Sequence, residues 1–349
     1  MGHWLSRGVL RDRFRHVGLL IAITLAGVPA TLQAADAVPP VTYFRIASGS
    51  VASADFPVGE AIANLISKPP GAAPCEPGGR CGVPGLVASA ETSAGALGEV
   101  RAVAAGRVDS ALVPADVVDW AWRGTGPFAG EGPRRDLAVI ATLHRASLHL
   151  VVRRGAGITR LRDLKGKRVS LGPANTLTAV EARLVLEAAG LRERNLVASH
   201  LEAGRAADAL AAGRLDAFFL VDSWPAQVIA DLAIRDTVDL LPLDGRVADS
   251  LRARNPLLAA TVIPAGTYGS IPATPTLDIA IEWIIPAGAG DDLVYQLARA
   301  LFDPVNRPVL QRAHPSMSGI SPGMAPGLAG VPLHPGAARY YAQAPPGKP

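Results

Sequence analysis

Residues 172–178 place small and hydroxyl-bearing side chains in a short loop between a predicted strand and a predicted helix. A helix N-terminus presents free backbone N–H groups and the positive end of the helix dipole, which suits a carboxylate or another anion. Similar loops follow two earlier predicted strands, at residues 48–56 and 91–93. An ordinary strand-to-helix turn gives the same pattern, so the loops alone leave both interpretations open.

Charged residues also stand at the ends of predicted strands. Asp116 follows one buried strand, Asp222 follows another, and His144 and Arg145 separate two more. The sequence contains no Ser-His-Asp order with a nucleophile elbow, no metal-spaced histidine cluster and no Gly-x-Gly-x-x-Gly after a strand. We therefore expect no catalytic residues, no metal site and no cofactor.

The helix after the third loop carries its own start and stop signals. Thr178 can cap it, with Glu181 three residues later as the reciprocal half of a capping box. Gly190 stands where a left-handed residue is expected after a helix. Apolar residues recur at helical spacing between them, so the pattern predicts a helix that packs on a sheet.

Strands and helices alternate along the rest of the chain, which predicts an α/β fold with mostly parallel sheets. The expected strands are 43–47, 85–90, 110–113, 137–143, 148–152, 168–171, 196–201, 217–221, 237–241, 260–263 and 276–285. The expected helices begin at Pro57 and near Pro225, and span 94–105, 117–122, 178–190, 206–212, 247–253 and 291–302.

One stretch is nearly repeated. Residues 102–113 (AVAAGRVDSALV) resemble residues 209–220 (ALAAGRLDAFFL), and an acidic loop follows each copy. This repeat predicts two similar lobes, of residues 41–147 plus 265–349 and of residues 148–264, although a common helix-to-strand turn could match by coincidence. Strand ends of two such lobes face a shared cleft, with hinges near 144–150 and 263–268.

The N-terminus has the composition of a secretory signal. Basic residues precede an apolar core of about twelve residues, which is short for a membrane span of roughly twenty. Small residues near position 34 suit cleavage, so we expect a signal peptide at residues 1–34, with an uncleaved anchor as the alternative. This segment carries +3 of the net charge of +4, and the remaining +1 gives no basic field for nucleic acid.

The two cysteines, Cys75 and Cys81, lie close together in a Pro/Gly-rich segment. After export to an oxidising compartment, we expect them to form one local disulfide. Two thiols without nearby histidine or aspartate make only half a metal ligand set.

Five stretches together resemble the TAXI-type solute-binding proteins of tripartite ATP-independent periplasmic (TRAP) transporters. They are residues 157–170 (GITRLRDLKGKRVS), 213–219 (GRLDAFF), 241–245 (LPLDG), 263–269 (IPAGTYG) and 332–341 (PLHPGAARYY). The resemblance implies a periplasmic-binding-protein-like fold, with two α/β lobes, hinge strands and a cleft between them. It also implies a periplasmic receptor that captures a small organic acid or amino acid and delivers it to membrane permease subunits.

The same resemblance implies that the pocket uses the loops at residues 48–56, 91–93 and 172–178. Together with the polar residues at other strand ends, these loops supply the predicted ligand-binding residues. They are Ser48, Gly49, Ser50, Phe56, Glu91, Thr92, Ser93, Asp116, His144, Arg145, Pro173, Asn175, Thr176, Thr178, Asp222, Ser223 and Trp224.

The chain departs from the family pattern by placing charges at Asp55, His144, Arg145 and Asp222. An unpaired charge in a closed cleft is unfavourable, so each should meet a ligand charge or a protein partner. One hypothesis is that Arg145 binds a ligand carboxylate and Asp222 an amine on the same ligand; solvated surface roles are the alternative. Two other functions stay open, a binding protein that signals to a receptor kinase and an enzyme on the same scaffold.

Overall fold

The computed structural model describes residues 40–72, 82–93, 95–324 and 330–344. The predicted signal peptide at residues 1–34 and the predicted Cys75–Cys81 disulfide lie outside these residues. Among the helices described, none has the length and apolar character needed to cross a membrane.

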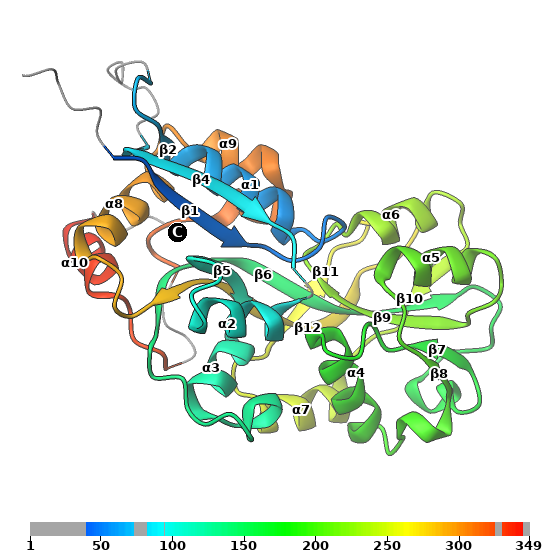
Figure 1. Cartoon of the computed structure of the whole chain (residues 1–349). Coiled ribbons are helices and arrows are strands. Elements are labelled where there is room, and N and C mark those ends of the chain that lie inside the picture. Colours follow the sequence, from blue (N-terminus) through cyan, green and yellow to red (C-terminus); the bar gives the residue numbers. More distant parts are fainter. Residues whose placement is uncertain (1–39, 73–81, 94, 325–329, 345–349) are drawn as a thin grey trace, which may run out of the picture. The chain divides into compact units, whose positions relative to one another are not determined.

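A mixed sheet runs through the described chain, with eight strands in the order β4-β1-β5-β12-β6-β9-β7-β8 (Figure 1). Two more strands pair at its middle, β10 with β6 and β11 with β12. The bounds are β1 Thr42–Ala47, β4 Leu86–Glu91, β5 Ser110–Pro114, β6 Leu137–Arg153, β7 Arg168–Ser170, β8 Val197–Ser199, β9 Ala217–Asp222, β10 Val238–Leu240, β11 Ala259–Ile263 and β12 Thr274–Pro286. A separate short pair joins β2 (Ser67–Lys68) to β3 (Val83–Pro84).

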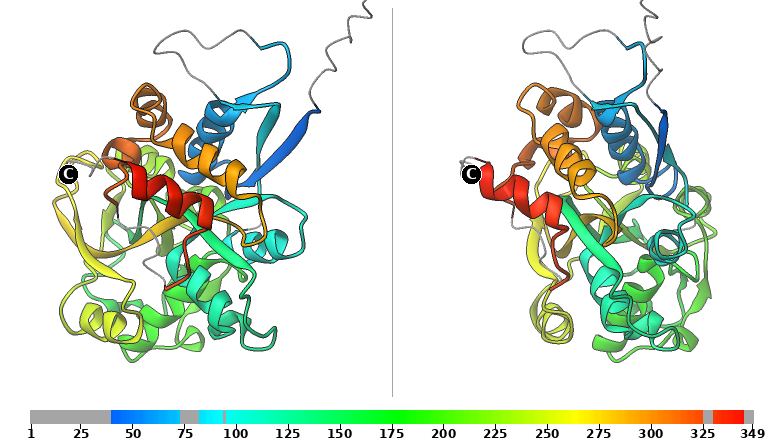
Figure 2. Two further views of the ribbon diagram at one scale, coloured as in Figure 1. Left: turned by 90° about the vertical axis from the view of Figure 1, so that its left-hand side faces the viewer. Right: turned by 60° about the vertical axis from the view of Figure 1, so that its left-hand side comes forward.

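Helices cover both faces of the sheet (Figure 1). The longer ones are α1 Asp55–Ile66, α2 Ala96–Ala104, α3 Ala115–Arg123, α4 Leu177–Ala188, α5 Ala203–Ala211, α6 Gln227–Ala233, α7 Gly245–Arg254, α8 Asp291–Leu301, α9 Arg307–Ala313 and α10 Pro335–Gln343. Four short 3₁₀ turns are described at Gly126–Phe128, Leu161–Leu164, Glu193–Asn195 and Pro315–Gly319. Figure 2 shows the C-terminal α10 beside α8, where Tyr340 stacks on Phe302.

Two βαβαβ units repeat the same design. The first unit is β1-α1-β4-α2-β5 and the second unit is β7-α4-β8-α5-β9, and in each the first strand lies between the other two. All pairings within each unit are parallel. The sequence repeat therefore falls on equivalent helix-to-strand connections, from α2 to β5 and from α5 to β9.

Two long antiparallel strands join the units. Residues 137–147 of β6 pair with β12, and residues 147–152 pair with β9. The prediction of two strands separated at residues 144–147 was therefore wrong: β6 continues for 17 residues because both of its parts find a partner strand. The ten-stranded sheet is continuous only through β6 and β12.

The sequence of strand β9 is almost wholly apolar because the strand is buried on both faces. Ala217 and Phe219 belong to the large hydrophobic core with residues of α4, whereas Phe218 and Leu220 belong to a second cluster with residues of α5 and α6. Alternate side chains of a strand point to opposite faces. Because helices cover both faces here, both sets of side chains are buried.

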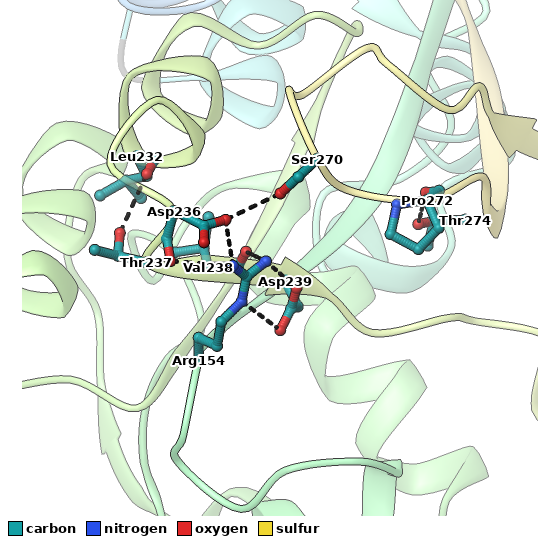
Figure 3. A network of polar contacts seen from close by, with 9 residues as sticks. All are labelled: Arg154, Leu232, Asp236, Thr237, Val238, Asp239, Ser270, Pro272 and Thr274. Atoms are coloured by element: carbon teal, nitrogen blue, oxygen red, sulfur yellow. Dashed lines mark hydrogen bonds and ion pairs between the residues drawn. The ribbon is translucent and has the colours of Figure 1, made fainter.

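The far end of β6 is held by an exposed polar network (Figure 3). Arg154 donates to Asp239 at 2.7 and 3.2 Å and also contacts Asp236, which accepts a hydrogen bond from Ser270 at 2.9 Å. Asp236 has a left-handed backbone, with φ of 53°. The network joins β10 and the loop before β12 to the end of β6, so it positions the second unit's side of the sheet.

Candidate functional site

A cavity of about 220 Å³ lies where the strand ends of the two units meet. Its wall comes from the β1–α1, β4–α2, β7–α4 and β8–α5 connections and from β9. Seven predicted binding residues line it, namely Gly49, Ser50, Ser93, Pro173, Thr176, Thr178 and Asp222. Residues of all three predicted loops therefore line one cavity.

Two glycines shape the loops that enter the cavity. Gly49 and Gly172 each stand two residues after a strand, with φ of 73° and 79°. A Cβ atom on Gly172 would lie 2.7 Å from Cγ2 of Thr178, and one on Gly49 would lie 2.6 Å from Oγ of Ser53. Both the left-handed backbone and the close contact require glycine.

The cap of α4 differs from the predicted one. The helix begins at Leu177, and Thr176 is the N-cap, whose Oγ1 accepts from the N–H of Ala179 at 3.4 Å. Thr178 instead accepts a hydrogen bond from the N–H of Val221 at 3.2 Å, which ties α4 to the end of β9. Glu181 does not complete a capping box, because it is the fifth residue of the helix rather than the third and is buried near Asp116.

Glu99 on α2 lines the cavity, although it is not among the binding residues predicted from the sequence. It is 2% exposed, and its Oε1 accepts hydrogen bonds from the N–H of Gly49 at 2.6 Å and from Oγ of Ser93 at 2.5 Å. Burial raises the pKa of its carboxyl to about 7. The signal available in the sequence was an acid among the buried positions Leu97, Val100 and Val103 of an otherwise apolar helix face.

The helix α2 begins at Ala96 rather than at residue 94, and its N-cap is Gly95. Ser93 still has a local role, because its Oγ accepts from the N–H of Gly95 at 3.0 Å while donating to Glu99. The serine thus links the loop backbone to the buried acid.

Asp222, at the end of β9, connects the two units. Its Oδ1 accepts from the N–H of Ala54 at 3.0 Å and from the N–H of Ser223 at 2.8 Å. Ala54 is the N-cap of α1, where a negative charge interacts favourably with the helix dipole. Burial nevertheless dominates and, together with the charge of Asp55, raises the pKa of Asp222 to about 7.

His144 lies just outside the lining, between the units. Oγ of Ser223 donates to the carbonyl of Arg145 at 2.8 Å, so it accepts from Nδ1 of His144 at 2.9 Å. Nε2 of His144 lies 3.1 Å from Oδ1 of Asp55, a cavity-lining acid at the start of α1. His144 therefore serves as the protein partner of Asp55.

The chain Ser223–His144–Asp55 contains the residue types of a hydrolase triad, but it does not form one. Ser223 is 1% exposed and does not line the cavity, and its hydroxyl already donates its proton to a backbone carbonyl. A serine nucleophile needs an accessible oxygen whose proton passes to the histidine.

Arg145 does not line the cavity. Its Nη2 lies 2.7 Å from Oδ1 of Asp278 on β12. Side chains alternate along β6, and the neighbouring Ala146 is the one that faces the cavity. In this structure Arg145 thus has a protein partner, so the charge does not need a ligand carboxylate.

Asp116 also lies outside the cavity, in a buried contact between the units. Its Oδ2 accepts from Nδ2 of Asn255 at 3.2 Å, and its carboxyl faces that of Glu181 on α4. Burial is the largest cause that raises the pKa of both carboxyls, and for Glu181 the charge of Asp116 adds to it. One proton shared between the two carboxyls removes the repulsion between their charges.

The remaining predicted residues surround the cavity without lining it. Ser48 is fully buried, where it packs against Gly59 of α1, and Ser223 lies beneath Asp222. Phe56, Glu91 and Trp224 are half-buried, whereas Thr92 and Asn175 are exposed. No described cluster of three or more His, Cys, Asp or Glu side chains could hold a metal ion.

The arrangement is a periplasmic-binding-protein-like α/β fold, with two similar units, two long joining strands and a cavity at the facing strand ends. The model of the NMT1-like family matches residues 46–344. The alkanesulfonate-binding protein SsuA from Xanthomonas axonopodis pv. citri, bound to MOPS, is 15% identical, with 88% of this chain and 86% of that chain covered and a TM-score of 0.44.

Two further solved structures match a similar share of this chain. A TctC solute-binding protein from Polaromonas is 14% identical, with 86% of this chain and 96% of that chain covered and a TM-score of 0.48. The ligand-binding core of GluR0 from Nostoc punctiforme, in complex with L-glutamate, is 14% identical, with 78% and 98% covered and a TM-score of 0.45.

Proposed function

The chain belongs to the NMT1-like family, and from this premise we propose that it is the solute-binding receptor of a transporter. The observation that carries the proposal is the cavity, because equivalent loops of two βαβαβ units converge on it. Ligands of α/β sheets bind at the carboxyl ends of the strands, where these loops lie.

The finer proposal concerns the kind of transporter. The five stretches that resemble TAXI-type proteins favour a TRAP system, whose receptor would capture a small organic acid or amino acid in the periplasm and present it to membrane permease subunits. The N-terminal segment with signal-like composition supports export. Neither nucleic acid nor a cofactor has a role in this proposal.

The lobes would be residues 41–147 plus 265–349 and residues 148–264, with β6 as a strand that passes from one lobe to the other. Strand β12 would belong to the first lobe and pair with both β6 and β11. Asp222 bound to α1 and the Asp116–Glu181 contact would then hold the lobes together in the closed state. Opening would separate these contacts while the long strands bend.

The test uses the exposed start of α5. Ala203 lines the cavity, and Ala203→Trp should fill part of its volume and abolish stabilisation by every solute that raises the melting temperature of the unsubstituted protein. Ala211→Trp, at the exposed other end of the same helix, is the matched control and should leave ligand stabilisation unchanged. Equal ligand stabilisation in both variants would contradict the proposal.

Two further measurements distinguish transport from an enzymatic or a sensing function. Mass spectrometry should recover it chemically unchanged after prolonged incubation, whereas conversion would favour an enzyme. Co-purification of the ligand-loaded protein with permease subunits would support transport, and co-purification with a receptor kinase would support sensing.

A further inference from the structure

The charged side chains that line the cavity are all acidic. They are Asp55 and Glu99 from the first unit and Glu202 and Asp222 from the second. Among the described residues that line the cavity, none is Lys, Arg or His. A cavity of this charge is a poor match for a dicarboxylate, since no fixed positive side chain would offset the ligand's charge.

These acids do not all have partners. Asp55 has His144 beside it, and Glu202 is exposed to solvent at the start of α5. Asp222 and Glu99 are different, because they are only 6% and 2% exposed and have no cationic side chain within the hydrogen bonds and ion pairs of the described chain. Two buried carboxyls thus face one cavity without a counter-charge.

Each of the two carboxyls also keeps one oxygen available. The two donors to Asp222, the N–H groups of Ala54 and Ser223, both bind Oδ1. The donors to Glu99, from Gly49 and Ser93, both bind Oε1. In the described structure the second oxygen of each group receives no hydrogen bond, and both residues line the cavity.

We propose that the solute carries a protonated amine, which Asp222 of the second unit and Glu99 of the first unit bind with their unpartnered oxygens. This inference rests on the proposed solute-binding function and names the chemical class of the ligand. An ammonium group donates up to three hydrogen bonds and supplies the charge that desolvated carboxylates need. The departure of Asp222 from the family pattern then has a direct role in ligand choice.

The proposal makes affinity depend on pH in a defined direction. Burial raises the pKa of both carboxyls to about 7, so in the empty protein each is largely protonated below neutral pH. Asp55 faces both groups, and His144 and His314 lie near Asp55. An amine binds the ionised carboxyls, so its affinity should rise through pH 7, by up to about tenfold per pH unit for each carboxyl below that point.

The experiment compares four probes with the same four-carbon chain: putrescine, 4-aminobutyrate, 1,4-butanediol and succinate. Each is added at 10 mM to the full mature chain, and the melting temperature and calorimetric affinity are measured at pH 6 and pH 8. We expect putrescine or 4-aminobutyrate to bind tightest, with at least tenfold higher affinity at pH 8 than at pH 6.

Asp222→Asn tests the residue itself. The amide oxygen can still accept from Ala54 and Ser223, so the fold should persist, while amine affinity should fall at least tenfold and lose most of its pH dependence. Glu99→Gln should act in the same direction. Glu187→Gln, which removes an exposed acid paired with Arg254 outside the cavity, is the matched control and should change neither.

Tightest binding of succinate or butanediol would overturn the amine assignment and leave the receptor function standing. No stabilisation by any of the four probes would overturn it as well, and a metabolite library would then decide the receptor function separately. Unchanged amine affinity in Asp222→Asn would remove that residue from the site.

Discussion

The two βαβαβ units share their framework but not their charges. In each, a glycine with positive φ follows the first strand, and an aspartate after the second helix accepts hydrogen bonds from the backbone N–H and the Nε of an arginine on the first strand. Those pairs are Asp109 with Arg45 and Asp216 with Arg168. The sequence repeat thus contains residues that build the same connection twice.

The units differ at the residues next to the cavity. Glu99, fourth in α2, corresponds to Ala206, fourth in α5. The first loop is held by the N–H of Gly49 bonded to Glu99, whereas the second loop contacts His200 through the carbonyl of Gly172 at 3.0 Å. The repeated residues therefore build the scaffold, and the acids that are not repeated give the cavity its charge.

The largest expected difference between the units concerns the repeated aspartate. Asp216 is mostly buried and contacts both Arg168 and Arg153, while Asp109 and Arg45 are more than a third exposed. Asp216 accepts four hydrogen bonds from Arg168 and Arg153, so Asp216→Ala should lower the free energy of unfolding by about 3 kcal/mol. Asp109→Ala should lower it by about 1 kcal/mol or less. Urea unfolding of both variants checks this order, and equal losses would mean that burial is not what separates the two pairs.

The repeated glycine gives the next largest effect. Gly172→Ala combines a left-handed backbone with a clash against Thr178 and should cost about 2 to 3 kcal/mol. Gly155 has the same φ of 79° but no neighbour within 4 Å, so Gly155→Ala should cost only about 1 kcal/mol. Thermal unfolding of both variants separates backbone strain from steric contact, and identical losses would show that Thr178 simply moves aside.

A smaller effect is expected at an unrepeated acid. Because burial raises the pKa of Glu181 and Asp116, their contribution to stability is present below about pH 4 and is lost as pH rises through their raised pKa values, which for Asp116 is about 6. Glu181→Gln should therefore raise the free energy of unfolding by about 1 to 2 kcal/mol at pH 8 and have little effect at pH 4. Glu187→Gln, on the exposed face of the same helix, should show no such pH dependence.

If Glu181→Gln destabilised the protein equally at pH 4 and pH 8, a shared proton between the two carboxyls would be ruled out. Guanidinium unfolding at both pH values provides the measurement. The same data would show whether the contact between the units weakens as pH rises.

The sequence was sufficient for the features that depend on local patterns. The α/β class and the loops at residues 48–56 and 172–178 follow from patterns within short stretches of sequence. The repeat across Gly106 and Gly213 follows from comparing residues 102–113 with residues 209–220. The order of the five stretches that resemble the family predicted the type of fold. These features need no knowledge of which strands become neighbours.

Other features depend on distant pairing and could not be predicted locally. Glu99 looked like one polar position in an apolar helix until Gly49, fifty residues earlier, was placed beside it. The partner of Arg145 could not be predicted because Asp278 lies 133 residues away in the chain. The continuity of β6 likewise follows from partners that occur later in the sequence.

Strand β6 leaves the ribosome before every strand that pairs with it, since β9, β10 and β12 all follow it in the chain. At synthesis rates of about 5 to 20 residues per second, its last partner arrives several seconds later or more. During that interval the edges of this mostly buried, apolar strand have no native partner strand. Because β6 and β12 join the two units, the centre of the sheet is completed only near the end of synthesis.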